Sequence, residues 1–120
     1  MAIKYYLQPN PITPDPNDQS ARVMPGKVLG HEEIIKEMLR RGSTLTEADI
    51  RAALNIFFKV VIDEVLEGNS VNLPICNIRP GLTGVFDSAT DSFDRGRHVI
   101  KASLTAGNAL YDQMLGAAVE

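Results

Sequence analysis

The sequence predicts an α+β fold, in which helices and strands of an antiparallel sheet occupy separate stretches of the chain. Three observations lead to this prediction. Two helix patterns follow one another between residues 31 and 67. Three β-prone segments follow between 70 and 104, and a short helix pattern covers 107–117. We therefore expect a helical hairpin, a three-stranded antiparallel sheet whose longer strands form an arm, and a short C-terminal helix.

The composition fits a single soluble domain. Of the 120 residues, 44% are hydrophobic and 22% charged, which is ordinary for a globular protein. The one cysteine, Cys76, cannot form an internal disulfide, and we expect a buried structural thiol there. No apolar run has the length of a membrane span, and the N-terminus lacks the pattern of a signal peptide. We expect a cytoplasmic protein that does not associate with membranes.

The first 30 residues predict a strand-and-loop extension packed on the body of residues 31–120. Residues 3–7 and 21–24 are β-prone, and the stretch between them holds four prolines, which exclude a helix. A hairpin-like pair of strands follows from this pattern. The alternative is a flexible leader, which would leave the aromatic side chains exposed without reason.

Residues 31–41 predict a short helix that ends at Gly42. Its acidic first turn and basic last turn both complement the helix dipole. Its apolar residues fall on one face, at the spacing of a 3.6-residue period. These residues are Ile34, Ile35, Met38 and Leu39. Only a few residues separate this helix from the next, so the two should pack as a hairpin.

The stretch from Ser43 to Leu73 predicts a long helix that one small domain cannot cover. Thr46 is a suitable N-cap, with Asp49 in a variant of the capping box, and Gly68 stops the helix after Glu67. Its apolar residues cover well over half of the circumference, whereas packing on one sheet needs a single stripe. We expect a homodimer whose interface includes Leu54, Phe57, Phe58, Val61, Ile62 and Val65. The alternative is that the first helix and the N-terminal strands cover this face completely.

The strand block predicts a β-arm. Residues 70–78 are expected to form a strand with an edge position or a bulge at Pro74, followed by a bend at Pro80-Gly81. Residues 82–86 form the next expected strand, 87–96 a polar tip, and 97–104 the returning strand.

The candidate functional residues form one local basic cluster on this arm. On the expected return strand, Arg95, Arg97 and Lys101 fall on one face, where they could follow a phosphate backbone; His98 lies among them and Arg79 could join from the outgoing strand. The alternative is a solvated face that discourages pairing with other strands.

Other candidates carry weaker signals. The amides of Gly107 and Asn108 open the last helix and could bind a phosphate. Phe93 could act as an apolar wedge, or pack against the arm or the partner chain. His31 and His98 lack companions at metal-ligand spacing, so we expect no metal site. We find no hydrolase motif or phosphate-binding glycine loop, and we expect neither a cofactor nor an enzyme.

The order and spacing of residues 31–117 resemble the HU and integration host factor family of bacterial DNA-bending proteins. The matching stretches are RGSTLTEADIRAALNIFFKVVIDEVLEGNSVNL and HVIKASLTAGNALYDQM. The resemblance implies an intertwined homodimer whose two β-arms reach around DNA. HU-like domains of Bacteroides-type bacteria look closer still, through IKYYL, TPDPND, ARV, VNLPICNIRPGLTGVFD and DSFDRGRH. In such proteins an immunoglobulin-like domain often follows, so the resemblance implies one as a further partner outside this sequence.

This chain also departs from the HU pattern. The tip contains no proline, and the family's Gly-Lys at the last helix is Gly107-Asn108. Residues 76–104 hold four basic side chains against three acidic ones, and the whole chain has net charge −3 and a pI of about 5.3. Two hypotheses follow: a nucleoid-associated, HU-like domain that contacts the DNA backbone with low sequence specificity, or an HU-fold interaction module that has lost DNA binding.

Overall fold

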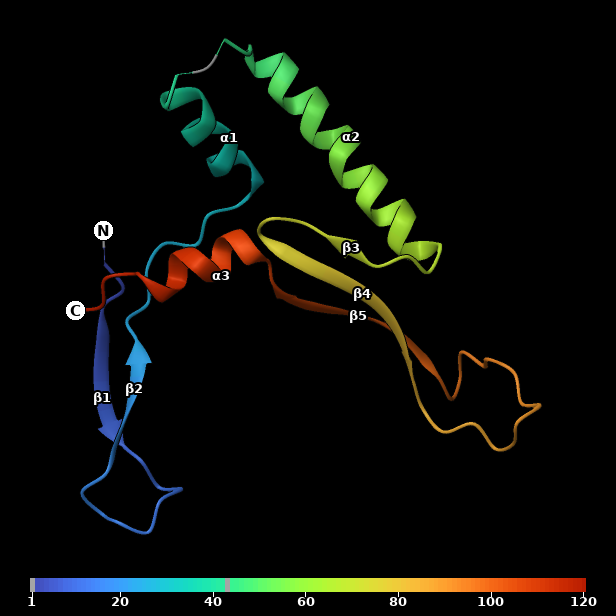
Figure 1. Ribbon diagram of the computed structural model, residues 1–120, viewed down its shortest axis with the longest axis horizontal. Coiled ribbons are helices and arrows are strands. Elements are labelled where there is room, and N and C mark those ends of the chain that lie inside the picture. The colour runs from blue at the N-terminus through green and yellow to red at the C-terminus, as the bar shows by residue number, and fades with distance from the viewer. Residues whose placement is uncertain (1, 43) are drawn as a thin grey trace.

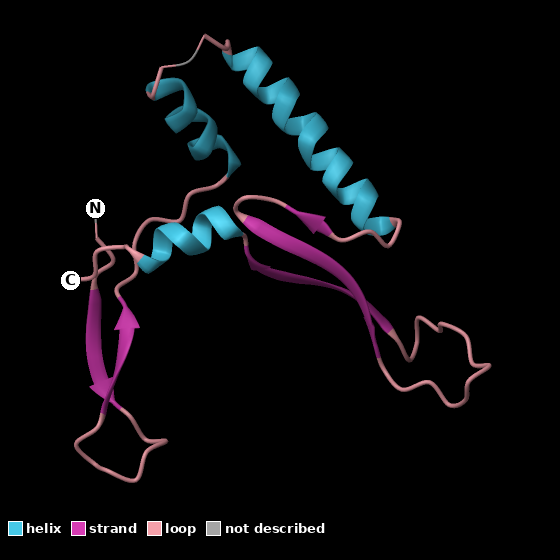
Figure 2. Ribbon diagram, viewed as in Figure 1, coloured by secondary structure: helices cyan, strands magenta, loops and turns pink. Residues whose placement is uncertain are grey.

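The computed structural model describes residues 2–42 and 44–120, so Met1 of the extension and Ser43 of the long-helix unit lie outside the described residues. It contains three helices and two antiparallel sheets, which confirms the mixed helix-and-strand order predicted above (Figures 1 and 2). In chain order the elements are β1 (Tyr5–Pro9), β2 (Gln19–Val23), α1 (His31–Arg40), α2 (Glu47–Leu66), β3 (Val71–Asn72), β4 (Cys76–Thr83), β5 (Val99–Ala106) and α3 (Asn108–Leu115).

The helical hairpin forms as predicted. The Thr46 hydroxyl accepts the Asp49 amide N–H at 3.1 Å, and the Asp49 carboxylate accepts the Thr46 N–H at 3.3 Å, which completes the capping box. The Arg51 guanidinium of α2 binds Glu32 of α1 at 2.6 Å. Ile35 and Ile50 are each only 1% exposed, because they pack where the two helices meet.

The three-stranded sheet has the order β3-β4-β5, with both pairs antiparallel. Strand β4 pairs with β5 along its whole length, from Cys76 opposite Ala106 to Thr83 opposite Val99. Strand β3 pairs only with Asn77 and Ile78. The β4–β5 ribbon therefore extends beyond β3 as an arm, which lies at the lower right of Figure 1.

Several predicted strand boundaries on the arm are wrong. Residues 70–78 are not one strand, because Pro74 lies in a turn between β3 and β4 in which the Leu73 N–H donates to the Cys76 carbonyl. Pro80 and Gly81 do not form a bend but lie within β4, opposite Ala102 and Lys101. A proline is tolerated there because β4 has no partner on its β3 side beyond Ile78.

The tip is also longer than predicted. Strand β4 ends at Thr83, because Gly84 takes a left-handed conformation with φ of +112°. A side chain at Gly84 would lie 2.6 Å from the Arg97 carbonyl oxygen, so the chain can turn so tightly only at a glycine. The return strand begins at Val99 and not at residue 97. The loop between the strands thus covers residues 84–98, which we call the tip.

The N-terminal extension is an antiparallel hairpin, as predicted, but β1 starts later than expected. Ile3 does not pair with β2; it forms a parallel bridge with Val119 after α3. The Ile3 N–H donates to Ala118, the Glu120 N–H donates to Ile3, and the Tyr5 N–H donates to Glu120. We call this contact between residues 3–5 and 118–120 the terminal clasp, and it fixes the hairpin to the segment that follows α3.

The predicted apolar face of α2 is largely uncovered within one chain. Phe57, Phe58 and Ile62 are 43%, 41% and 58% exposed, while Leu54, Val61 and Val65 are half-buried. The alternative that α1 and the N-terminal strands cover this face completely is therefore wrong. The hairpin β1–β2 lies beside α3, at a distance from α2 (Figure 1).

The chain is also flat and open. Its extents are 57 × 54 × 24 Å and its radius of gyration is 20.6 Å, against about 14 Å for a compact domain of this length. Its accessible surface is 10065 Å², against about 6,400 Å² for a compact protein of this mass. One chain alone therefore buries far less surface than a self-contained domain.

Candidate nucleic-acid interface

The three-stranded sheet separates its side chains onto a polar and an apolar face. Successive residues of a strand point to opposite faces, and directly paired residues point to the same face. The register therefore places Asn72, Asn77, Arg79, Thr83, Lys101, Ser103 and Thr105 together on one face, with Val99 at its end opposite Thr83. The opposite face carries Val71, Ile78, Leu82, Ile100 and Leu104. This apolar face and the C-terminal end of α2 enclose a groove of about 510 Å³.

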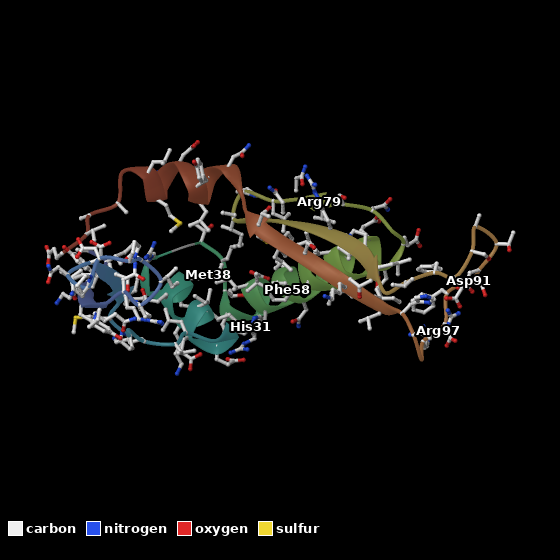
Figure 3. The ribbon with its side chains drawn as sticks, turned by 90° about the horizontal axis from the view of Figure 1, so that it is seen from below. His31, Met38, Phe58, Arg79, Asp91 and Arg97 are labelled. Carbon is white, nitrogen blue, oxygen red and sulfur yellow. The ribbon has the colours of Figure 1, made fainter. Side chains whose placement is uncertain are left out.

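The polar face, which we call the stem face, carries two cations and no acid. Arg79 lies opposite Ser103, and Lys101 lies opposite Gly81, so the two cations are diagonal neighbours. Strands β3, β4 and β5 contain no aspartate or glutamate. Within the described ranges, neither cation forms an ion pair. Figure 3 shows Arg79 on the opposite side of the sheet from His31 and Phe58 of the helical hairpin.

The stem face continues towards the start of α3. Asn72, Asn77 and Asn108 line one hollow of about 460 Å³, together with the turn at Leu73 and Pro74. Amide side chains both donate and accept hydrogen bonds. The stem face and this hollow therefore offer a continuous strip of hydrogen-bonding groups without negative charge.

A glycine is required at position 107 for steric reasons. A Cβ at this position would collide with the Leu73 carbonyl oxygen and lie 2.5 Å from that of Pro74, so only glycine permits this approach. Its amide N–H already donates to Ile75 at 3.0 Å. The Gly107 amide is thus engaged in the fold, so a phosphate contact there would have to compete with the Ile75 carbonyl oxygen. Asn108 is the first residue of α3, in the first turn as predicted, and it lies on the rim of the hollow.

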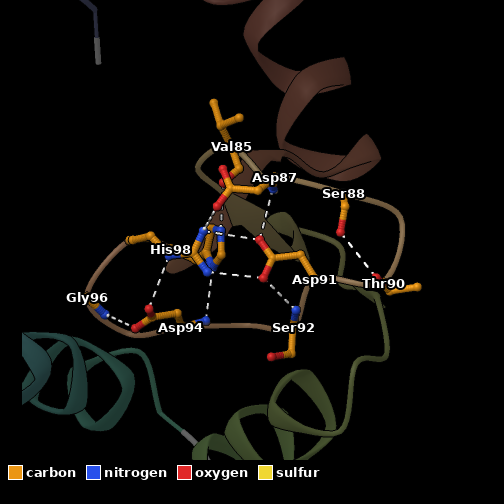
Figure 4. Close-up of polar contacts among 10 residues, drawn as sticks. Val85, Asp87, Ser88, Thr90, Asp91, Ser92, Asp94, Gly96 and His98 are labelled. Carbon is orange, nitrogen blue, oxygen red and sulfur yellow. Dashed lines mark hydrogen bonds and ion pairs between the residues drawn. The ribbon is translucent and has the colours of Figure 1, made fainter.

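The tip is folded around His98, which is only 2% exposed. Its ring stacks on Phe86 with centroids 3.7 Å apart and lies 5.8 Å from the ring of Phe93. The Asp94 N–H donates to Nδ1 at 2.9 Å, so Nε2 carries the proton and donates to the Val85 carbonyl oxygen, also at 2.9 Å (Figure 4). His98 is thus the centre of a small core in the tip.

Arg97 is enclosed by three carboxylates of the same tip. Its guanidinium binds Asp87 at 3.0 Å and Asp91 and Asp94 at 3.1 Å each. Hydrogen bonds from Arg97 and from the Asp87 amide lower the pKa of Asp91 to about 2. The Gly96 amide, and then Arg97, lower the pKa of Asp94, and both carboxylates raise the pKa of Arg97. Figure 3 labels Arg97 and Asp91 at the far end of the arm.

The structure therefore divides the predicted basic cluster. The prediction that Arg95, Arg97 and Lys101 share a strand face is wrong, because only Lys101 lies in β5. Arg95 and Arg97 belong to the tip, and the Arg95 guanidinium lies over the Phe93 ring at 5.7 Å. The burial of His98 explains the difference, since its ring holds residues 94–98 in a turn.

The sequence analysis missed the hydrogen-bonding residues of the stem face. Asn72, Asn77, Ser103 and Thr105 became recognisable as one surface only with the strand register. The signal was present in the alternation of apolar and polar residues over 100–106, which strict period-two reading would have found.

Two other kinds of feature are absent from the described part of the chain. No group of three or more His, Cys, Asp or Glu side chains there could hold a metal ion. No helix in residues 2–42 or 44–120 is long and apolar enough to cross a membrane.

The family to which the chain belongs is a family of DNA-binding domains. The family model of an HU-type DNA-binding domain matches residues 2–119, and the chain belongs to this family. A solved structure from Bacteroides vulgatus ATCC 8482, described as a candidate bacterial DNA-binding protein, has the same fold, with a TM-score of 0.84 at 20% identity. The match covers 99% of this chain and 47% of that one, so this chain spans about half the length of its structural neighbour. No curated protein matches the chain.

Proposed function

We propose that this chain is an HU-like architectural DNA-binding domain that acts as a homodimer and carries out no catalysis. Each β4–β5 arm contacts the DNA backbone, with little reading of base sequence, at the nucleoid in the bacterial cytoplasm. The observation that carries the proposal is the stem face, where Arg79 and Lys101 lie among amides and hydroxyls without any acid. Membership of a DNA-binding domain family supports it.

The chemistry of the stem face suits phosphates better than bases. Phosphate contacts come from Arg, Lys, Ser, Thr and Asn side chains and from backbone N–H groups, and these contacts carry no sequence information. The stem face offers all of these side-chain types. Low sequence specificity follows from this composition.

The uncovered face of α2 supports the homodimer. One chain exposes about 3,700 Å² more surface than a compact protein of its mass. Obligate dimers bury about 2,000 to 5,000 Å² in total, or about 1,000 to 2,500 Å² on each chain, so a second copy could cover a large part of this excess. The predicted interface residues Phe57, Phe58 and Ile62 are the exposed part of the α2 face.

The tip makes a smaller contribution in this proposal. Arg97 is already neutralised by aspartates, and His98 is buried, so neither offers a free charge to DNA. Arg95 remains exposed and without an ion pair among the described residues, and Phe93 packs in the tip below it. We assign DNA contact to Arg79, Lys101, Arg95 and Asn108, in that order of expected effect.

A second candidate is an HU-fold interaction module that no longer binds DNA. The observation in its favour is the tip, where three aspartates outnumber Arg95 and Arg97, in a chain of net charge −3. An anionic tip opposes the approach of phosphates.

A salt-dependent binding experiment separates the two candidates. Fluorescence anisotropy of a labelled duplex would be measured with the full chain at about 50 to 200 mM salt, where phosphate contacts weaken steeply. We expect binding that weakens with salt, and weaker binding for Arg79→Ala with Lys101→Ala. The matched control is Lys36→Ala with Arg41→Ala, which removes the same charge from α1 and its C-cap. Absence of wild-type binding at about 100 µM, the weak end of non-specific affinities, would favour the interaction module.

The homodimer is tested by sedimentation. Val61→Asp with Val65→Asp should convert a dimer into a monomer or an unfolded chain, because it places charges in an apolar interface. Lys59→Asp on the same helix is the exposed control. A wild-type chain that sediments as a stable monomer at micromolar concentration would contradict the dimer.

A further inference from the structure

We propose that the N-terminal hairpin is a second nucleic-acid contact surface, formed by Lys4, Tyr6 and Arg22. This inference rests on the DNA-binding role proposed above and extends it to an element outside the β4–β5 arm. The three residues share one face of the hairpin, neither cation forms an ion pair among the described residues, and the hairpin is held in place by the terminal clasp.

The register brings the three side chains together. Tyr6 lies directly opposite Arg22, and Tyr5 lies opposite Val23. The Met24 N–H donates to the Lys4 carbonyl oxygen at 2.8 Å, so the pairing continues one step beyond β1. Alternation then places Lys4, Tyr6 and Arg22 on one face, and Tyr5, Leu7 and Val23 on the other.

Arg22 has no acid beside it on this face, whereas Lys4 pairs with Glu120 in the backbone register of the terminal clasp. Its remaining members are Gln8, Ser20 and Met24, and none is acidic. Among residues 2–42 and 44–120, Lys4 and Arg22 form no ion pair. Glu120 lies beside Lys4, because its N–H donates to Ile3 and its carbonyl oxygen accepts the Tyr5 N–H, while Asp15 and Asp18 lie in the loop at the other end.

The hairpin therefore has an arrangement of charged residues similar to that of the β4–β5 arm. Each is a two-stranded ribbon with two cations on one face and aspartates in the loop at its end. Tyr6 adds an aromatic ring beside Arg22, with 45% of its surface exposed. A phenolic hydroxyl can donate to a phosphate, and an aromatic ring can stack on an unpaired base.

The hairpin is fixed to the body. Three backbone hydrogen bonds of 2.8 to 3.0 Å in the terminal clasp join residues 3–5 to 118–120. Figure 1 shows the hairpin and the arm at opposite ends of α3, both extending towards the lower part of the view. Contact with both ribbons therefore calls for a polyanion long enough to reach them.

The opposite face of the hairpin suits another kind of partner. Leu7 and Val23 are 59% and 66% exposed, and a second copy of the chain could cover them. A hairpin that acts only through this apolar face would contribute to dimerisation and not to DNA binding. The experiment below distinguishes the two roles.

The test is Lys4→Gln with Arg22→Gln in the full chain, measured by anisotropy with the same labelled duplex over a range of salt. We expect binding about tenfold weaker at low salt, and a salt slope smaller by about 1.8 for each chain, as for two lost phosphate contacts. The control Lys36→Gln with Arg41→Gln should leave both quantities near those of the wild type. Arg22→Lys should retain most of the affinity, because it keeps the charge.

Three results would overturn the proposal. If the hairpin variant keeps wild-type affinity and slope while Arg79→Ala with Lys101→Ala weakens binding, the hairpin does not contact DNA, and the proposed function stands. If the hairpin variant weakens binding only where sedimentation shows monomers, the hairpin acts in dimerisation. If the wild type shows no salt-dependent binding, the proposed function fails as well.

Discussion

The stem and the tip of the β4–β5 arm place the same kinds of cation in opposite situations. On the stem face, Arg79 and Lys101 lie among amides and hydroxyls, and no neighbouring acid of the described residues neutralises their charge. In the tip, the Arg97 guanidinium lies within 3.1 Å of three aspartates, which neutralise its charge. The difference teaches that the availability of a cation depends on its neighbours in the fold, and not on the local density of basic residues in the sequence.

The largest expected effect comes from giving the stem face the character of the tip. Ser103→Asp places a carboxylate directly opposite Arg79 and should weaken DNA binding about tenfold at low salt, by neutralising one contact and repelling phosphates. Ser103→Asn has nearly the same shape without charge and should bind like the wild type. Anisotropy measures both, and equal affinities for the two variants would contradict a role for the stem face.

The converse change should make the tip resemble the stem. Asp87→Asn with Asp91→Asn removes two of the three carboxylates around Arg97. We expect DNA binding to strengthen and its salt slope to steepen by about 0.9, as for one added phosphate contact. Adding Arg97→Gln to this variant should remove the gain. A gain that survives Arg97→Gln would mean that charge alone, and not the freed guanidinium, is responsible.

The order of the tip should depend on His98 with little effect on the stem. His98→Ala removes the ring that accepts the Asp94 N–H and stacks on Phe86. We expect the Asp94 amide to lose its protection in hydrogen exchange, while amides of β4 and β5 near Arg79 remain protected. DNA affinity should change less than threefold, since the tip offers no free Arg97 charge. Loss of protection throughout β4 and β5 would show that the tip and the stem fold as one unit.

The smallest effect is expected when the pH is lowered. The pKa of Asp91 is lowered to about 2 in the folded tip, from an ordinary value near 3.8. A carboxyl whose pKa is lowered stabilises the fold above its ordinary pKa, and this stabilisation is lost as the pH falls towards the lowered value. The tip should therefore loosen between about pH 4 and pH 2. NMR titration of the Asp91 carboxyl and of the Ser92 amide, which donates to it at 2.9 Å, measures this change. An Asp91 carboxyl that titrates near pH 4 would contradict the ion-pair network.

Much of the fold follows from local signals in the sequence. The capping box of Thr46, the glycine after α2 and the apolar period of α1 each act within a few neighbouring residues, so α1 and α2 were placed to within a residue or two. The excess apolar surface of α2 was also predictable, because it depends only on the helical period and the composition.

The strand register and the tip could not be predicted in the same way. Pro74 and Pro80 have the same local chemistry, yet Pro74 lies in a turn and Pro80 lies in a strand. Only the extent of β3, which the sequence does not reveal, distinguishes the two positions. His98 and Arg97 read as polar strand residues, but long-range contacts with Val85, Phe86 and Asp87 draw them into the tip. Such contacts are fixed by tertiary structure and leave no periodic signal.

The terminal clasp has a consequence for the order of folding. The bridge between Ile3 and Val119 joins positions separated by nearly the whole 120-residue chain. Contacts of such long separation carry the largest entropy of loop closure, and they are favoured only after the intervening segments are ordered. We expect the N-terminal hairpin to take its place last, once α3 has docked beside the β3–β4 turn. The first residues of the chain would then be among the last to reach their final position.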